Sequence, residues 1–215
     1  MNGPLHGIRV LDVSRILAGP FCTMLLADLG AEVVKVEIPG AGDPSRSIEP
    51  TIDGESVFFI SINRGKKSIT IDLSKQEGQR IFRGLVPHFD VLVENFVPGT
   101  MERFGLDYPS LKKINPRLVY ASISGYGQDG PWAKRPALDV TVMAMGGLMS
   151  ITGEPGGEPL RPGASLADST AGVFAALAIV SALWQRQSSG TGQSIDISML
   201  DCQVTMMENP IARYF

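Results

Sequence analysis

Short apolar runs rich in β-branched residues recur along the chain, separated by stretches whose apolar residues follow a helical spacing. The runs predict strands at Ile8–Val13, Glu32–Glu37, Ser68–Leu73, Val91–Asn95, Leu118–Ser122 and Ser194–Ile197. The intervening patterns predict helices at Pro20–Leu29, Lys75–Val86, Met101–Phe104, Tyr108–Ile114, Val140–Ile151, Ser169–Gln187 and from Met199 onward. Strands that alternate with helices are typical of a parallel sheet, so the pattern predicts an α/β fold.

The sequence predicts one domain over residues 1–215. It contains no internal repeat, no low-complexity segment and no convincing linker, and 215 residues suffice for one large α/β unit. An apolar helix begins at Met199, and the sequence stops soon afterwards. We expect something to pack on that helix, either more chain or a partner subunit, which indicates a truncated domain.

Composition places the chain among globular proteins that act on small molecules. Hydrophobic residues make up 44% and charged residues 19% of it, and a net charge of -3 argues against a nucleic-acid surface. Cys22 and Cys202 lie far apart without CxxC spacing, so neither a disulfide framework nor a metal site is expected. A reducing cytoplasm or organelle matrix fits this cysteine usage.

No segment predicts secretion or a membrane span. The N-terminus has a strand-like apolar run but lacks the basic region of a signal peptide. The most apolar stretch, Ala171–Trp184, falls short of the roughly 20 residues that cross a bilayer, so we expect a buried helix.

Glycine-rich connections at Pro39–Asp43, Gly125–Pro131 and Gly153–Gly157 suit turns with positive φ, where sites often lie. The dinucleotide, Walker and nucleophile-elbow motifs are missing, which weakens the nicotinamide, kinase and hydrolase interpretations. The two histidines, His6 and His88, offer few candidates for a catalytic triad. A carboxylate nucleophile needs no histidine.

Blocks in order along the whole chain resemble CoA-transferase family III, which includes formyl-CoA transferase and dicarboxylate CoA-transferases. They are Leu11–Thr23, Leu29–Glu37, Gly42–Asp43, Asn63–Ser68, Val93–Gly99, Ser124–Pro131, Ala167–Asp168 and Thr191–Asp196. The resemblance implies the N-terminal half of a longer protein with a Rossmann-like, doubly wound, mostly parallel sheet. It also implies acyl-CoA and carboxylic acid substrates, no permanently bound cofactor, and an interlocked homodimer.

Asp168 matches the family's nucleophile, an aspartate that precedes a long helix. Its carboxylate would attack a thioester and then carry CoA as an aspartyl thioester. An ordinary helix N-cap is an alternative role for Asp168, and both roles are compatible. On either interpretation we expect the helix dipole to hold the carboxylate ionised at neutral pH.

The resemblance also implies the CoA contacts. The candidates are Arg15, Ile16, Ala18, Ile71, Asn95, Phe96 and Arg103. Asn63, Arg64, Lys66 and Lys67 form a basic segment that either contributes to this site or is a solvated loop.

Asp139 is a secondary candidate and is expected to order a loop rather than to catalyse. Racemases of the family carry a His-Asp pair at this point, whereas this chain has Leu138-Asp139, and leucine cannot move a proton. CoA transfer, with succinyl-CoA and a dicarboxylate as the favoured substrates, is therefore the leading hypothesis. Arg161 could pair with a distal substrate carboxylate or lie on the surface. The alternatives are an acyl-CoA racemase and a catalytically incomplete fragment that binds CoA.

Overall fold

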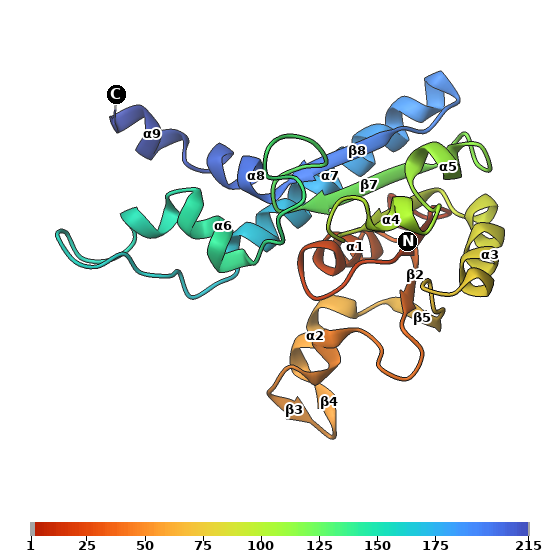
Figure 1. Cartoon of the computed structure of the whole chain (residues 1–215), viewed down its shortest axis with the longest axis horizontal. Coiled ribbons are helices and arrows are strands. Elements are labelled where there is room, and N and C mark those ends of the chain that lie inside the picture. Colours follow the sequence, from red (N-terminus) through yellow and green to blue (C-terminus); the bar gives the residue numbers. More distant parts are fainter. Residues whose placement is uncertain (1–2, 215) are drawn as a thin grey trace.

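A six-stranded parallel sheet forms the centre of the molecule. The computed structural model describes residues 3–214. The strands are β1 (Arg9–Asp12), β2 (Glu32–Glu37), β5 (Lys66–Thr70), β6 (Val91–Glu94), β7 (Val119–Ser124) and β8 (Ser194–Ser198). They lie in the order β5-β2-β1-β6-β7-β8, and every adjacent pair is parallel. Figure 1 shows β7 and β8 side by side. Numbered along the chain, these strands have the order 3-2-1-4-5-6 of the Rossmann fold.

Helices cover both faces of the sheet, as expected for a doubly wound fold. One face packs against α1 (Ala18–Asp28) and α7 (Leu166–Ser189), and the other against α3 (Gln76–Leu85), α4 (Thr100–Arg103) and α5 (Tyr108–Lys112). Successive side chains of a strand point to opposite faces of the sheet, and this produces the two cores. Val10 packs in the core with α1 and α7, whereas its neighbour Leu11 packs in the core that contains Phe82 of α3. The predicted α/β class is confirmed.

The largest departure from the predicted elements lies between β2 and β5. Here the chain forms a short hairpin, β3 (Thr51–Ile52) with β4 (Glu55–Ser56), and then α2 (Val57–Asn63), which together make a projection (orange in Figure 1). None of these was predicted. Ser56 is the N-cap of α2 and accepts a hydrogen bond from the Phe59 N–H, a local signal that the hydrophobic pattern does not carry.

Two predicted elements are shifted or divided. Strand β5 begins at Lys66 rather than Ser68. The helix predicted from Val140 to Ile151 is α6 (Asp139–Met145) followed by a 3-10 turn at Leu148–Ile151. Gly147, with φ 82°, separates them. Two further helices, α8 (Met199–Thr205) and α9 (Glu208–Tyr214), complete the described chain.

Helix α7 is longer than its sequence pattern indicated. It has 24 residues, beginning three residues before the predicted helix Ser169–Gln187 and ending two residues after it. Among the described residues it is the one helix that is long and apolar enough to cross a membrane, by length and composition alone. Ala171, Ala175 and Ile179 on its inner side are fully buried in the core with α1 and the sheet. The predicted buried helix is therefore confirmed, with both of its boundaries within three residues of the prediction.

Gly172 allows α7 to approach α1 closely. A Cβ atom at this position would lie 2.8 Å from the Ala18 carbonyl oxygen and 3.3 Å from the Cys22 nitrogen, both of them backbone atoms that cannot easily move. We expect Gly172→Ala to lower the free energy of unfolding by about 1–3 kcal/mol, because the two helices must separate. Urea unfolding measures this change.

Gly84→Ala is the matched control. Gly84 lies in α3, and a Cβ atom there would meet nothing within 4 Å. Alanine has the higher helix propensity, so this variant should gain up to about 1 kcal/mol of stability. If Gly172→Ala and Gly84→Ala lost the same amount of stability, the close contact between α1 and α7 would not be the reason that position 172 requires glycine.

Candidate active site

The candidate site lies where the sheet changes its winding direction. Strands β1 and β6 are neighbours, but the chain leaves β1 toward β2 on one side and leaves β6 toward β7 on the other. The loops that follow the two strands therefore diverge and leave a crevice at their carboxyl ends, where open α/β sheets bind ligands. The turn Ser14–Leu17 follows β1, and the turn Asn95–Pro98 follows β6.

A cavity of about 230 Å³ lies in this crevice. It brings together seven of the nine residues proposed from the sequence: Arg15, Ile16, Ala18, Asn95, Phe96, Asp139 and Asp168. Leu138, Arg135 and Met199 also line it. Residues that are 153 positions apart in the sequence, such as Arg15 and Asp168, thus line one cavity because β1, β6, β7 and α7 converge there.

The other two predicted residues lie elsewhere. Ile71 lines a second cavity, of about 310 Å³, whose walls also include Arg15 and Phe96. These two side chains therefore stand between the Ile71 cavity and the Asp168 cavity. Arg103 lies outside both cavities, is exposed, and donates a hydrogen bond to Thr100 Oγ1 at 3.1 Å.

The Arg15–Ile16 turn has an unusual backbone that Asn95 holds in place. Ile16 has φ 65°, in the left-handed region, which for a β-branched residue costs on the order of 1–3 kcal/mol. The Asn95 side chain accepts from the Arg15 N–H and donates to the Arg15 carbonyl, each at 2.8 Å. The Arg15 guanidinium lies over the Phe96 ring, 4.8 Å from its centroid.

Asp168 is not the N-cap of its helix. Helix α7 begins at Leu166 with Ser165 at the cap position, so Asp168 is the third helical residue. The free N–H groups of Ala167 and Asp168 instead donate to Oδ1 of Asp139, at 3.0 and 3.2 Å. Asp139 therefore caps α7 from a distant segment, and the N-cap alternative for Asp168 was wrong.

This arrangement also changes the charge expected on Asp168. Burial, and then the neighbouring Asp139 carboxylate, raise the pKa of Asp168 from 3.8 to about 7. The expectation that the helix dipole holds Asp168 ionised throughout the neutral range is therefore corrected, because Asp139 occupies the N–H groups that would stabilise a second anion. Near pH 7 Asp168 exists in both forms, as a tuned acid or nucleophile often does.

Arg161 lies beside this carboxylate pair. Its guanidinium is 3.6 Å from Asp139 Oδ2, and the side chain is about half exposed. Asp139 Oδ2 is buried, and among the described residues it accepts no hydrogen bond. Arg161 therefore lies on the surface and also beside the site, with Asp139 as its partner.

Comparisons with known proteins identify the family. The sequence profile described as "CoA-transferase family III" matches residues 5–215. The chain belongs to CoA-transferase family III. It is 48% identical to the succinyl-CoA:glutarate CoA-transferase of Mus musculus, over 98% of this chain and 49% of that one. It is 46% identical to the acetyl-CoA:oxalate CoA-transferase of Acetobacter aceti, over 98% of this chain and 54% of that one.

A solved structure agrees with this assignment. The crystal structure of a CAIB/BAIF family protein from Brucella suis superposes with a TM-score of 0.95 at 44% identity, covering 100% of this chain and 58% of that one. The chain thus spans about half the length of the curated relatives it matches. The resemblance to the N-terminal half of a family III CoA-transferase is confirmed.

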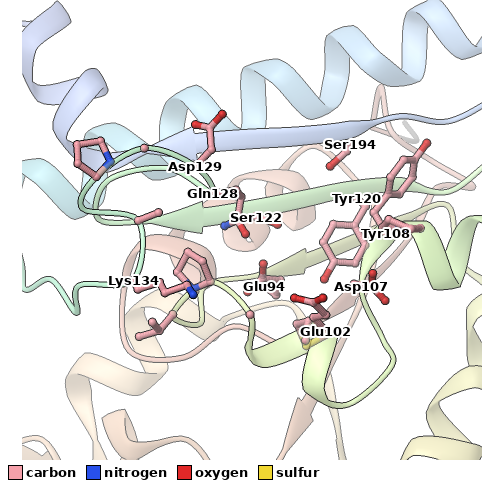
Figure 2. A pocket seen from close by; sticks show the side chains of 18 residues that line it. Glu94, Glu102, Asp107, Tyr108, Tyr120, Ser122, Gln128, Asp129, Lys134 and Ser194 are labelled. Carbon is pink, nitrogen blue, oxygen red and sulfur yellow. The ribbon is translucent and has the colours of Figure 1, made fainter.

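An acidic cavity of about 620 Å³ adjoins the site and shares Val97 and Pro98 with it. Figure 2 shows Glu94, Glu102 and Asp107 around its lower part, with Asp129 across from them and Lys134 at one side. Burial raises the pKa of Glu94 to about 7. A surface of this charge repels phosphate groups.

The residues that the sequence analysis missed are buried charges beneath the Ser14–Leu17 turn. Asp12, Lys35 and Asp43 are each at most 2% exposed. The Lys66 ammonium is also buried, 3.1 Å from Asp12 Oδ2, so the predicted basic loop does not exist as such. A charged residue at the centre of an apolar strand, as in Val34-Lys35-Val36, was the signal available.

The rest of the predicted basic segment does not reach the site. Asn63 is the last residue of α2, and its side-chain oxygen accepts from the buried Lys66 ammonium. Arg64 pairs with Asp28, and Lys67 pairs with Glu32 at 2.9 Å, both on exposed surface. The segment therefore combines structural and surface contacts, and none of its residues lines the Asp168 cavity or the Ile71 cavity. Its contribution to CoA binding stays a prediction.

Proposed function

We propose that this chain binds acyl-CoA and supplies the nucleophile that moves CoA between carboxylic acids, with Asp168 as the catalytic residue. The observation that carries the proposal is the position of Asp168. It is a partly buried carboxylate of perturbed pKa in the cavity at the switch point of a Rossmann-ordered sheet. Membership of CoA-transferase family III supports the same reaction class.

We place coenzyme A in the two adjacent cavities that share Arg15 and Phe96, because the Ile71 cavity has two carboxylates, Glu37 and Asp72, whereas the acidic cavity has four. In this proposal its nucleotide end lies in the Ile71 cavity, and its thioester end reaches the Asp168 cavity across Arg15 and Phe96. Arg15 is the cation available at the junction, and the Phe96 ring offers apolar surface. Arg103 contributes only if its exposed side chain turns toward the ligand.

The reaction proceeds by four attacks at carbonyl carbons. The Asp168 carboxylate attacks the acyl-CoA thioester and forms a mixed anhydride as the CoA thiolate leaves. The thiolate then attacks the aspartyl carbonyl, which gives an aspartyl-CoA thioester and releases the first acid. The acceptor carboxylate attacks this thioester and expels the thiolate, which attacks the acceptor carbonyl of the new anhydride. Asp168 and the acceptor's CoA thioester are the products.

The walls of the cavity favour these steps. Ionised Asp168 is the nucleophile, and its raised pKa makes it more basic than an ordinary carboxylate. Helix α1 begins at the cavity with Leu17 at its N-cap, a side chain without a polar atom, so its first N–H groups remain available to a developing oxyanion. Apolar Ile16, Leu138 and Met199 limit water in the same space.

Succinyl-CoA and a dicarboxylic acid are the proposed substrates. The names of the relatives from Mus musculus and Acetobacter aceti each pair a CoA donor with a dicarboxylate. Arg161, half exposed beside Asp139, offers a guanidinium for the distal carboxylate. Racemase activity gains no support, because exposed Leu138 lines the cavity and has no group that moves a proton.

We propose that the protein is a homodimer of the cytoplasm or an organelle matrix. Helix α7 presents Val173, Leu177 and Trp184 on its outer side, each at least half exposed, which is the kind of apolar surface that a partner covers. Cys22 and Cys202 are buried free thiols, compatible with a reducing compartment. Residues 1–215 would be its CoA-binding and catalytic domain.

Calorimetric titration with coenzyme A tests the binding half of the proposal. We expect wild type to bind and Arg15→Ala to bind about 10-fold more weakly, because a charge-assisted contact is lost. Arg117→Ala is the control, since Arg117 is an exposed arginine outside both cavities that contacts the Gly190 carbonyl. Equal losses in the two variants, or no binding by wild type, would count against the proposed site.

A further inference from the structure

The glycine-rich connection after β2 places a carboxylate under the active-site turn. Asp43 ends this connection and is 2% exposed. Gly42 has φ 68°, and a Cβ atom there would lie 3.0 Å from Glu37 Oε2, so only glycine fits this bend. The Asp43 N–H donates to Glu37 Oε2 at 2.9 Å, and Arg46 holds the Glu37 carboxylate from the other side.

Asp43 supports the turn at both ends of Arg15. Its Oδ1 accepts a hydrogen bond from the Ile16 N–H at 3.2 Å. Its Oδ2 forms an ion pair with Lys35 Nζ at 2.8 Å, and the same ammonium donates to the Ser14 carbonyl at 2.8 Å. The two peptide groups that flank Arg15 are thus fixed by one ion pair, while Asn95 fixes Arg15 itself.

A second ion pair completes the cluster. Asp12, the last residue of β1, lies 3.1 Å from the Lys66 ammonium and 4.0 Å from that of Lys35, and it accepts from Thr23 of α1 at 2.6 Å. Burial alone would raise the pKa of Asp12, but the two ammonium groups, with the hydroxyls of Ser14 and Thr23, outweigh burial and hold that pKa well below its usual range. Burial would likewise raise the pKa of Asp43, but Lys35 and the hydrogen bonds from Ser45 lower it below its usual range, so both carboxylates are ionised at neutral pH.

Buried ion pairs of this kind contribute little net stability compared with apolar residues of the same size, so a stability role alone explains them poorly. Their geometry has a more specific consequence. The Ile16 backbone is in a region that isoleucine avoids, and it persists only where its surroundings hold it. The cluster supplies the partners of that backbone directly next to the Asp168 cavity.

We propose that Asp43, together with Lys35, is a positioning residue for acyl-CoA: the ion pair preorganises the Arg15–Ile16 turn against which the CoA chain lies. The inference rests on the proposed function for the identity of the ligand. Neither residue lines the Asp168 cavity, so each acts through the turn and not by contact with substrate.

Coenzyme A titration of Asp43→Ala, combined with amide hydrogen exchange of the peptide that contains Ile16, tests this role. We expect CoA affinity to fall about 10-fold or more and exchange at Ile16 to accelerate, because the turn must then be ordered on binding. Asp43→Asn keeps an oxygen for the Ile16 N–H but loses the charge toward Lys35, so its affinity should lie between wild type and alanine. If Asp43→Ala does not fold, the CoA affinity of Asp43→Asn tests the positioning role by itself.

Asp90→Ala is the matched control. Asp90 pairs with buried Arg186 at 2.8 Å at the amino ends of the strands, far from the turn. This variant should lose stability but keep wild-type CoA affinity and Ile16 exchange. Folded Asp43→Ala and Asp43→Asn proteins with wild-type affinity would overturn the inference. Wild type that does not bind CoA would remove the proposed function and, with it, the CoA role of Asp43, whereas exchange at Ile16 would still show whether the turn is held.

Discussion

Asp168→Asn is expected to abolish covalent capture of CoA by this chain. After incubation with succinyl-CoA, mass spectrometry of wild type should reveal an aspartyl thioester at residue 168, which hydroxylamine converts to a hydroxamate and borohydride reduces. Asparagine has nearly the same shape but is a far weaker nucleophile. The rate of adduct formation should therefore fall by at least about 1,000-fold, as for other lost nucleophiles.

Two comparisons make this result specific. Asp129→Asn changes an exposed aspartate in the neighbouring acidic cavity, and its rate of adduct formation should equal that of wild type. Coenzyme A affinity of Asp168→Asn should stay close to wild type, because no contact with the nucleotide end is lost. An adduct that persists in Asp168→Asn would assign the nucleophile to another residue, whereas wild type that binds CoA without reacting would indicate a catalytically incomplete fragment.

The same substitution is expected to stabilise the free chain at alkaline pH. The folded state raises the pKa of Asp168 from 3.8 to about 7, through burial and the Asp139 charge. Below pH 4 the group is protonated in both folded and unfolded chains and has no effect. As pH rises from 4 to 7, the unfolded chain releases this proton first, so the folded state is progressively destabilised.

Asparagine at position 168 avoids the cost of burying a charged carboxylate, since it carries no charge at any of these pH values. A carboxyl pKa raised from 3.8 to about 7 lowers the free energy of unfolding at alkaline pH by about 4 kcal/mol, and partial exposure of the side chain reduces this to about 2 kcal/mol. We expect Asp168→Asn to raise the free energy of unfolding in urea by this amount at pH 8 and by little at pH 4. A gain of the same size at both pH values would show that burial of the carboxylate charge is not the cause.

The pattern of hydrophobic residues determined the centre of the sheet because β1, β2, β6 and β7 bury both of their faces along nearly their whole length. All six sheet strands were predicted, with boundaries within three residues, and the long core helix was placed correctly. The hairpin between β2 and β5 was missed because its strands have only two residues each, too few to show a period. Helix α2 was missed because its apolar run is nearly continuous and only seven residues long, so it shows no helical period. Resemblance to the family, carried by motifs, then indicated seven residues that the fold brings into one cavity.

Charge states and backbone partners were decided by the tertiary structure alone. The sequence places Asp168 near a helix N-terminus, but only the fold brings Asp139 to the N–H groups that Asp168 was expected to use. Likewise Lys66 belongs to a run of basic residues in the sequence, yet in the fold its ammonium is buried against Asp12. The physical reason is that apolar burial follows a local period, whereas electrostatic interactions depend on distances between groups remote in the sequence.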